Sequence, residues 1–454
     1  MDSPSVKTVS ECFVKPESMP EDSKQAYHLS HFDLAMISVQ YIQKGHLFRK
    51  PKEAHNETEF MNTLLQKLRD SLSIALVHFY PLAGRLVTSK AENPKCYSIF
   101  VDCNDSPGAR FIHATTGLSV SDILGSKYVP LVVQSFFDHH KAVNHDGHEQ
   151  SLLSVKVTEL VDGIFIGLSM NHAMGDGSSF WSFFSSWSEI FRAQESDKNG
   201  GFRITNPPAL RRWFPEGRGP ILGLPFNHPD EFIRRYESPV LKERMFHFSS
   251  ETIRRLKSQA NQECGTTMIS SFQSLTAFMW RSVTRARRLP LDQETSCRVA
   301  ANNRSRMKPP LSGNYFGNCI SAVRTSSKAG DLLENGLGGA ALKVHRAVVG
   351  HTSEKIDETI DHWFKSPYVY HIDRLFEPLS IMMGSSPRFD KYGCEFGMGK
   401  AVTLRSGYSH KFDGKVSAYP GREGGGSIDL EVCLVPEFME ALESDQGFMS
   451  LVSS

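Results

Sequence analysis

The chain has 454 residues and a formal net charge of +1, with 40% hydrophobic and 22% charged residues. This balance is typical of a globular protein, and it excludes attraction to nucleic acid or to a membrane surface through bulk charge. A chain of this length exceeds one ordinary core and suits two domains of about 200 residues each.

The N-terminus and the cysteines indicate the cellular compartment. Residues 1–7 lack the apolar stretch of a signal peptide, and no run of about 18 apolar residues occurs. The eight cysteines show no C-x-x-C pairing, which favours reduced thiols in the core over a disulfide or metal framework. We therefore expect a cytosolic protein.

Two features stand out in the first third of the chain. Residues 57–76 carry apolar side chains at helical spacing, which predicts an amphipathic helix. Farther on, four histidines gather at His139, His140, His145 and His148. A metal site needs ligands fixed on neighbouring elements, whereas the asparagine, aspartate and glycine between these histidines favour a surface turn. We expect no metal there.

The most informative segment is 170–177, Met-Asn-His-Ala-Met-Gly-Asp-Gly. The uncharged residues 163–170 predict a buried strand before it. After it, aromatic residues recur at helical spacing, and Ser178 or Ser179 is available as the helix N-cap. His172 therefore follows a strand and precedes a helix, where a rigid scaffold can present it to a cleft.

His172 allows two interpretations. Because histidine titrates near neutral pH, it can accept a proton from a nucleophile and return it later. Asp176 would then orient the ring, or pair with an arginine and hold the loop. Alternatively, His172 is structural and Asp176 is an N-terminal residue of the helix. Gly175 and Gly177 indicate a turn in either case.

Glycine and proline residues accumulate over 196–240, which predicts a long crossover. It would separate an N-terminal domain, 1–195, from a C-terminal domain, 241–454. In the second half the patterns predict strands over 243–248, 297–301, 414–419 and 427–434, and a helix from Ser250.

Basic residues recur near the expected helices of the second half: Arg254, Arg255, Lys257, Arg281, Arg285, Arg287 and Arg288. They form either an ordinary solvated face or a rim for a phosphorylated ligand. No G-x-S-x-G elbow and no nucleotide-binding glycine loop occurs, which disfavours a serine nucleophile and P-loop chemistry.

Several motifs, in order, resemble the plant BAHD acyltransferases, which move an acyl group from coenzyme A to an alcohol or amine. Residues 171–177 are similar to the N-H-x-x-x-D-G motif of that family. Other landmarks that match it cover nearly the whole chain: 29–33, 79–86, 271–281, 303–306, 315–318 and 395–400.

The resemblance implies an α/β fold of two similar-sized domains, with mixed sheets flanked by helices and an active-site channel at their interface. It implies that His172 is the general base and that Arg304 pairs with Asp176, which makes Asp176 and Gly177 structural supports. By family position, Lys257 is expected at a CoA phosphate. The expected partners are acyl-CoA, a co-substrate and not a bound cofactor, and a small-molecule alcohol or amine. We expect a monomer without metal, nucleic-acid or membrane partners.

The chain departs from the family pattern at two places. Where the family has D-F-G-W-G, the second motif reads Glu395, Phe396, Gly397, Met398 and Gly399. A flexible thioether thus replaces a flat ring that is expected near the acyl-CoA channel. Upstream, 384–389 lacks the tryptophan that many members have. The possible oxyanion or channel residues are therefore Ser385, Ser386 and Asn318.

We therefore expect acyl transfer from acyl-CoA to a hydroxyl or amine of a plant specialised or cuticular metabolite. One alternative is a lyase of the same fold that acts on a carboxylated, isochorismate-derived metabolite. Another is a non-catalytic member of the family. The presence of His172 favours transfer, while Met398 and the missing tryptophan keep the lyase open.

Overall fold

The computed structural model describes residues 5–51, 57–92, 95–196, 204–375 and 377–453. The strands are β1 (Lys7–Val14), β2 (Tyr27–His28), β3 (Ile42–Arg49), β4 (Arg85–Glu92), β5 (Lys95–Asp102), β6 (Ala109–Thr115), β7 (Leu153–Glu159), β8 (Gly163–Met170), β9 (Lys242–Phe248), β10 (Glu294–Asn302), β11 (Ile320–Lys328), β12 (Ile381–Gly384), β13 (Thr403–Ser406), β14 (Lys415–Pro420) and β15 (Ile428–Leu434). The helices are α1 (His31–Leu34), α2 (Glu57–His78), α3 (Val120–Leu124), α4 (Gly177–Ser196), α5 (Ser250–Glu263), α6 (Ser271–Ala286), α7 (Ala329–Glu334), α8 (Gly336–Val349), α9 (Ser353–Lys365), α10 (Ile372–Leu375), α11 (Pro436–Ser444) and α12 (Gln446–Met449).

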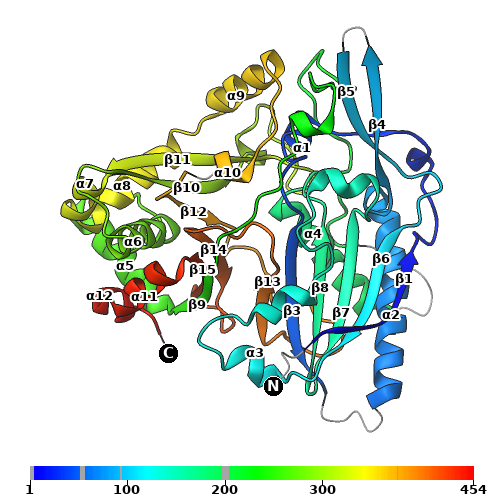
Figure 1. Cartoon of the computed structure of the whole chain (residues 1–454), viewed down its shortest axis with the longest axis horizontal. Helices are drawn as coiled ribbons and strands as arrows, with labels where there is room; N and C mark the ends of the chain where they lie inside the picture. Colours follow the sequence, from blue (N-terminus) through cyan, green and yellow to red (C-terminus); the bar gives the residue numbers. More distant parts are fainter. Residues whose placement is uncertain (1–4, 52–56, 93–94, 197–203, 376, 454) are drawn as a thin grey trace.

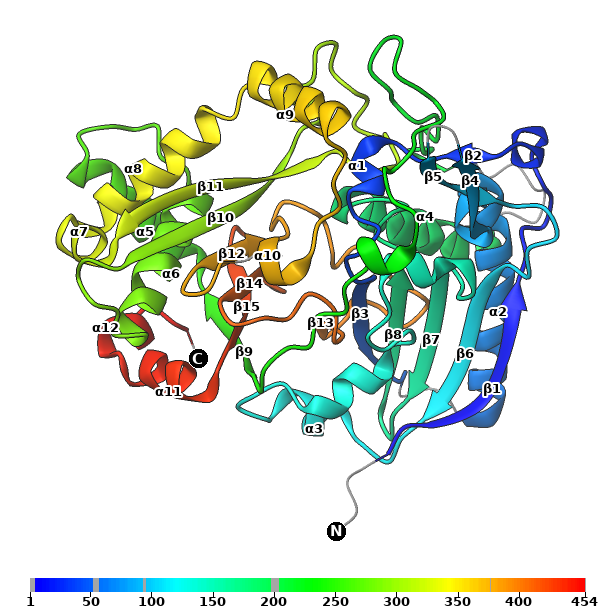
Figure 2. The ribbon, with the colours of Figure 1, turned by 45° about the horizontal axis from the view of Figure 1, so that its top comes forward.

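The first half of the chain is built on a mixed six-stranded sheet in the order β1-β6-β7-β8-β3-β13. Every residue of β8 is buried, as its uncharged sequence predicts, because it lies between β7 and β3 in the sheet. The helices α2 and α4 pack together beside this sheet (Figure 2). The buried stripe of α2 follows the predicted helical spacing, and it joins the aromatic side chains of α4 in one hydrophobic core.

A second mixed six-stranded sheet, in the order β11-β10-β12-β14-β15-β9, forms the other half. The helices α5, α6 and α8 pack against one another beside it, with their own hydrophobic core (Figure 1). The predicted pair of C-terminal strands is present, since β14 and β15 are antiparallel neighbours joined by a glycine-rich turn. The expected fold class, two α/β units with mixed sheets and flanking helices, is confirmed.

The two halves are interleaved by one short strand. β13 pairs antiparallel with β3, although the sequence assigns its residues to the domain over 241–454. It therefore forms the edge strand of the first sheet, and Figure 1 shows it between the two halves.

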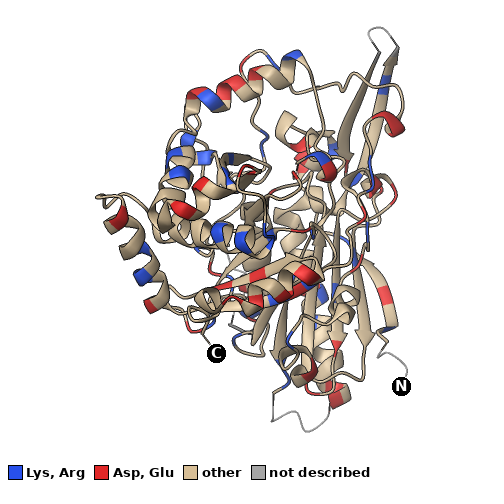
Figure 3. Ribbon diagram, turned by 60° about the vertical axis from the view of Figure 1, so that its left-hand side comes forward, with Lys and Arg blue, Asp and Glu red and all other residues tan. Residues whose placement is uncertain are grey.

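The crossover over 196–240 can be followed from Ile204 onwards, because 197–203 lies outside the described residues. This described part is largely irregular and contains the short 3-10 helix Pro229–Glu231. Within the described part of the chain, no helix has the length and apolar character that crossing a bilayer requires. Basic and acidic residues are intermingled along the ribbon (Figure 3). The eight cysteines are unpaired; Cys12, contrary to the expectation of core thiols, is exposed.

Candidate active site

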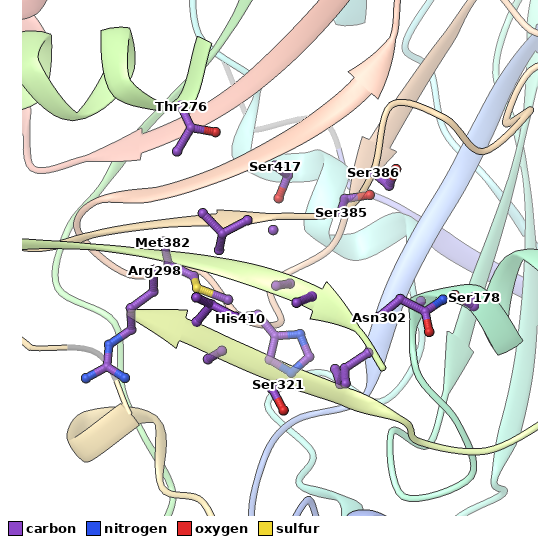
Figure 4. Close-up of a pocket in the computed structure, with 18 of the residues that line it drawn as sticks. Ser178, Thr276, Arg298, Asn302, Ser321, Met382, Ser385, Ser386, His410 and Ser417 are labelled. Carbon is purple, nitrogen blue, oxygen red and sulfur yellow. Dashed lines mark hydrogen bonds between the residues drawn. The ribbon is translucent and has the colours of Figure 1, made fainter. Parts of the chain in front are cut away.

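A cavity of about 1060 Å³ lies between the two halves, where the sequence predicts a channel. His172 and the first turn of α4 contribute to its wall from the first half. The second half contributes residues of β10, β11, β12 and β14. Figure 4 shows the hydroxyl groups of Ser385, Ser417 and Ser321 around this space, with His410 among them. The cavity thus brings residues from both halves to one polar surface.

The histidine loop, residues 171–177, is fixed on both sides of His172. The His172 backbone N–H donates to Asn144 Oδ1 at 2.7 Å. Its carbonyl oxygen accepts from Asn318 Nδ2, also at 2.7 Å. Asn171 Nδ2 donates to the Asn144 carbonyl at 2.8 Å. Asn144 therefore binds both the histidine and the asparagine that precedes it. The end of β8 is therefore held at a defined position before the turn into α4.

The His172 ring has one nitrogen turned into the protein. Nδ1 is buried and has no hydrogen-bond partner among the described residues, whereas the residue lines the cavity. The His410 ring lies perpendicular to it, with 5.5 Å between the ring centroids. Burial lowers the pKa of His172 below its ordinary value, an effect that the nearby Asp176 charge only partly offsets. The lowered pKa favours the neutral imidazole, which is the form that can accept a proton.

Asp176 is turned away from the histidine ring and forms an ion pair with Arg304. The two guanidinium nitrogens donate to the two carboxylate oxygens at 2.8 and 3.1 Å, a bidentate arrangement. The carboxylate also accepts from the backbone N–H groups of Ser178, Ser179 and Cys319. Asp176, and not the predicted Ser178 or Ser179, therefore caps the start of α4. The Asp176 side chain is 0% exposed and accepts five hydrogen bonds. These bonds connect the histidine loop to α4 and to the second half of the chain.

Of the two loop glycines, Gly175 is the one whose position requires glycine. A Cβ atom at Gly175 would lie 2.5 Å from Ser179 Cβ. At Gly177, by contrast, a Cβ atom would meet nothing within 4 Å. Gly177 lines the cavity, so a side chain there would enter substrate space and leave the loop intact.

Asn318 does not line the cavity as expected but lies behind His172. Its side-chain amide donates both to the His172 carbonyl and to Asp33 Oδ1, at 2.7 and 2.9 Å. Asp33 in turn pairs with Arg212 of the crossover at 2.9 Å, and Arg212 donates to the Met174 carbonyl. Sequence reasoning missed Arg212, because an arginine within an irregular proline-rich segment reads as a solvated one.

The predicted serines lie on the cavity wall, whereas the second motif does not. Ser385 and Ser386 line the cavity, and Ser385 Oγ accepts from Lys391 Nζ at 2.6 Å. Phe396 is fully buried against aromatic side chains of α4, and Met398 packs partly buried against the same core. Neither lines the cavity, so Met398 does not replace a channel ring as expected.

The other members of the second motif are also placed at a distance from the histidine. The Glu395 backbone exchanges hydrogen bonds with the Ser188 hydroxyl of α4. Gly397 and Gly399 both adopt a positive φ, 73° and 71°, which favours glycine. The motif therefore fastens the C-terminal half to α4.

Two further groups of sequence candidates lie outside the cavity. Lys257 is exposed on α5 and is not a lining residue, so its contact with a CoA phosphate stays a prediction. Of the four clustered histidines, His139 is bonded to the Ser151 hydroxyl and His148 to the Thr88 hydroxyl. Among the described residues, no group of three or more His, Cys, Asp or Glu side chains is placed to hold a metal ion.

Known proteins are similar to this chain in sequence and fold over nearly its whole length. A model of the Transferase family matches residues 4–449. The chain is 34% identical to an uncharacterized acetyltransferase of Arabidopsis thaliana, with 98% of each chain covered. It is also 34% identical to the BAHD acyltransferase DCR of the same plant, with 98% of this chain and 92% of that one covered.

Among solved structures, TRI101 of F. sporotrichioides complexed with coenzyme A and T-2 has the same fold. Its TM-score to the chain is 0.72 at 16% identity, over 94% of this chain and 99% of that one. The family model and the two relatives cover both sheets as well as the histidine loop. The chain therefore belongs to the BAHD family and is an acyltransferase of the class that transfers groups other than amino-acyl groups.

Proposed function

We propose that the chain transfers an acyl group from acyl-CoA to a hydroxyl or amine of a plant metabolite, with His172 as the general base. The observation that carries this proposal is the position of His172 on the wall of a large cavity between the two halves. Burial lowers the pKa of its imidazole, which favours the neutral form that can accept a proton. The cavity is large enough for two small substrates to meet beside the ring. We also propose that the enzyme works as a cytosolic monomer, which cell fractionation and size-exclusion chromatography would test.

The chemistry needs one base and no covalent enzyme intermediate. His172 accepts the proton of the acceptor O–H or N–H as that group attacks the thioester carbon. The tetrahedral intermediate then collapses, the C–S bond breaks, and the leaving thiolate takes the proton from His172. Such general-base catalysis contributes about 10²–10⁴-fold, and holding both substrates at the base adds to the rate.

Asn318 supports the assignment because its side chain can select the required tautomer. The buried His172 Nδ1 and the buried Asn318 Oδ1 both lack partners, and the amide of Asn318 already contacts His172. An Nδ1–H directed at Asn318 Oδ1 would leave Nε2 unprotonated and basic. We assign Asn318 as a positioning residue of the base.

The oxyanion donors proposed here are Ser385 and Ser386. Because Ser385 Oγ accepts from Lys391 Nζ, its own proton is free to point into the cavity. Ser385 also holds a left-handed backbone, φ 65°, which serine rarely adopts. Strained positions of this kind cluster at functional sites.

The test is release of free thiol from several acyl-CoAs, with and without phenolic, fatty-alcohol and amine acceptors. Thiol released only when an acceptor is present supports transfer. His172→Gln should lower kcat by about 10²–10⁴-fold while the unfolding transition stays unchanged. His410→Gln is the matched control, since it removes the cavity histidine whose ring lies against that of His172. Loss of activity in His410→Gln but not in His172→Gln would indicate that His410 is the general base, and it would contradict this proposal.

The same assay addresses the lyase. Formation of product from one carboxylated metabolite, without CoA and without thiol release, would contradict acyl transfer. A protein that binds acyl-CoA but turns over none of these mixtures would indicate a non-catalytic member of the family.

A further inference from the structure

One wall of the cavity carries more positive than negative charge. We call the cavity-lining residues Lys44, Lys411, Lys415 and Glu431 the basic floor. It forms where the two sheets meet: Lys44 of β3 donates to the hydroxyl of Tyr419 on β14, at 2.6 Å. Polar residues on strands of both sheets therefore share one buried surface beside the site.

The charged residues behind the basic floor do not cancel its positive charge. Behind the floor lie two more buried cations, Lys391 and Arg405, and one buried carboxylate, Glu243. Glu243 and Glu431 act electrostatically on Lys44 and Lys411, and Glu431 acts on Lys415. Five basic side chains thus share three carboxylates, since Asp429 also acts electrostatically on Arg405. Buried charges are normally paired, so such an excess calls for a compensating anion.

Most of these groups are satisfied by the protein. Lys411 forms an ion pair with Glu243. Lys391 donates to Ser385 Oγ and to the Ala418 carbonyl, at 2.6 and 2.9 Å. Glu431 accepts from the Ser406 and Tyr419 hydroxyls.

Lys415 differs from the other charged residues of this region because its side chain has no hydrogen-bond or ion-pair partner among the described residues. A glycine makes room for this ammonium group, because a Cβ atom at Gly384 would come within 2.2 Å of Lys415 Nζ. Burial, and then the neighbouring Lys44 charge, lower the pKa of Lys415 to about 8. The group is therefore still mostly protonated at neutral pH and faces the cavity.

The unpaired ammonium lies close to the reacting position. Lys415 and Lys44 both act electrostatically on His410, whose ring centroid is 5.5 Å from that of His172. Ser417 and Ser385 line the cavity on the same side and show their hydroxyls together in Figure 4. A ligand group bound at Lys415 would thus lie in the same cavity as His410 and the base His172.

We propose that Lys415, with Lys44 beside it, binds a carboxylate group of one of the two substrates. This inference rests on the proposed function and narrows its substrate class to carboxylated molecules. The carboxylate is either the free end of a dicarboxylic acyl group or part of an acceptor acid. Both offer the same acceptor oxygens to an ammonium, and a charge-assisted hydrogen bond to a carboxylate is among the strong ones.

The experiment measures binding by titration calorimetry on the full chain, so that it needs no turnover. In one arm, malonyl-CoA is compared with acetyl-CoA. In the other, 4-coumarate and shikimate are each compared with their methyl esters. In one of the arms the carboxylate probe should bind about 10- to 100-fold more tightly than its neutral counterpart. The arm in which this occurs identifies the source of the carboxylate.

Lys415→Met should abolish this preference, because it keeps the length of the side chain but removes the charge. Lys355→Met is the matched control: it removes a lysine that lines the cavity on α9, and the preference should survive. Gly384→Ala provides a second variant if Lys415→Met folds poorly, since the new Cβ would displace Nζ and reduce the preference. The proposal is wrong if neither arm shows a preference for the carboxylate, or if the preference survives both Lys415→Met and Gly384→Ala.

Failure of this inference and failure of the proposed function remain separable. A preference that depends on Lys415, in a protein that transfers no acyl group, would uphold the site and contradict the transferase proposal. Acyl transfer that depends on His172, without any preference for carboxylates, would uphold the transferase proposal and contradict the carboxylate site.

Discussion

The histidine loop and the basic floor line the same cavity but treat charge in opposite ways. In the loop, the Asp176 carboxylate has 0% exposure and meets a guanidinium and three backbone N–H groups. In the floor, Lys415 faces the cavity without an acceptor from the described part of the chain. A charge whose bonds are all made by the protein supports the fold, whereas an unpaired charge at a cavity is available to a ligand.

This difference separates two roles that the H-x-x-x-D spacing alone leaves joined. Asp176 and Arg304 hold the turn, and His172 is the loop residue to which we assign the proposed chemistry. The same criterion, applied to the floor, singles out Lys415 from several neighbouring cations. Four predictions test whether the buried charge of the histidine loop is paired by the protein while the Lys415 charge of the basic floor is not.

The largest effect is expected from Arg304→Ala. It would leave the Asp176 carboxylate buried without its countercharge, which typically costs about 3–5 kcal/mol. The free energy of unfolding, measured by urea denaturation, should fall by that amount. Arg304→Ala combined with Asp176→Asn should recover part of the loss, since no buried charge then remains unpaired. A loss below about 1 kcal/mol in the single variant would mean that the loop does not depend on this pair.

The next effect concerns the turn itself. Gly175→Ala would place a methyl group 2.5 Å from Ser179 Cβ, and overpacking of this kind costs about 1–3 kcal/mol. Gly177→Ala is its control, because the added methyl meets nothing within 4 Å. Thermal unfolding should therefore distinguish the two variants, with Gly177→Ala close to the wild type. Equal destabilisation by both would contradict the described geometry of the loop.

The two regions also differ in how far the sequence predicts them. The strand β8, the helix α4 and the pair β14–β15 follow from local patterns, because their burial repeats at fixed spacing. The Asp176–Arg304 pair and the role proposed for His172 were predicted from the resemblance to family motifs that lie far apart in the chain. The floor could not be predicted, since Lys44 and Lys415 occupy strand positions at which a polar residue normally indicates solvent.

The position of β13 explains why the floor was missed. This four-residue strand has no repeating pattern, yet it pairs Ser406 with Lys44, more than 350 residues away along the chain. Lys44 itself donates to the hydroxyl of Tyr419 on β14, in the other sheet. A local pattern describes the neighbours along a strand but not the strand that becomes its partner. The prediction that Lys257 contacts a CoA phosphate likewise came from its position in the family motif and not from a local pattern. In the structure Lys257 lies exposed on α5.

The pH dependence of kcat/KM should differ between a carboxylated substrate and its neutral counterpart. The pKa of His172 is lowered by burial, so activity on both should persist below pH 6.5 before the base becomes protonated. On the alkaline side, burial and the neighbouring Lys44 charge lower the pKa of Lys415 to about 8, an effect that Cys433 and Glu431 only partly offset. Above that pH, kcat/KM for the carboxylated substrate should fall up to tenfold per pH unit. The neutral substrate should not show this limb, and its presence for both substrates would assign the limb to another group.

The smallest effect, and the most direct test of the contrast, is the stability of Lys415→Met. A buried charge without a partner destabilises the fold, so replacing it with an apolar chain of similar length should not cost stability. Because Lys415 retains contact with the cavity, we expect the free energy of unfolding to stay unchanged or to rise by about 1 kcal/mol. The gain should shrink as the pH rises from 7 towards 10, since the wild-type lysine then becomes neutral and its burial less costly. A loss of more than about 2 kcal/mol would show that Lys415 is paired by the protein as Arg304 is, and the two regions would then follow the same rule.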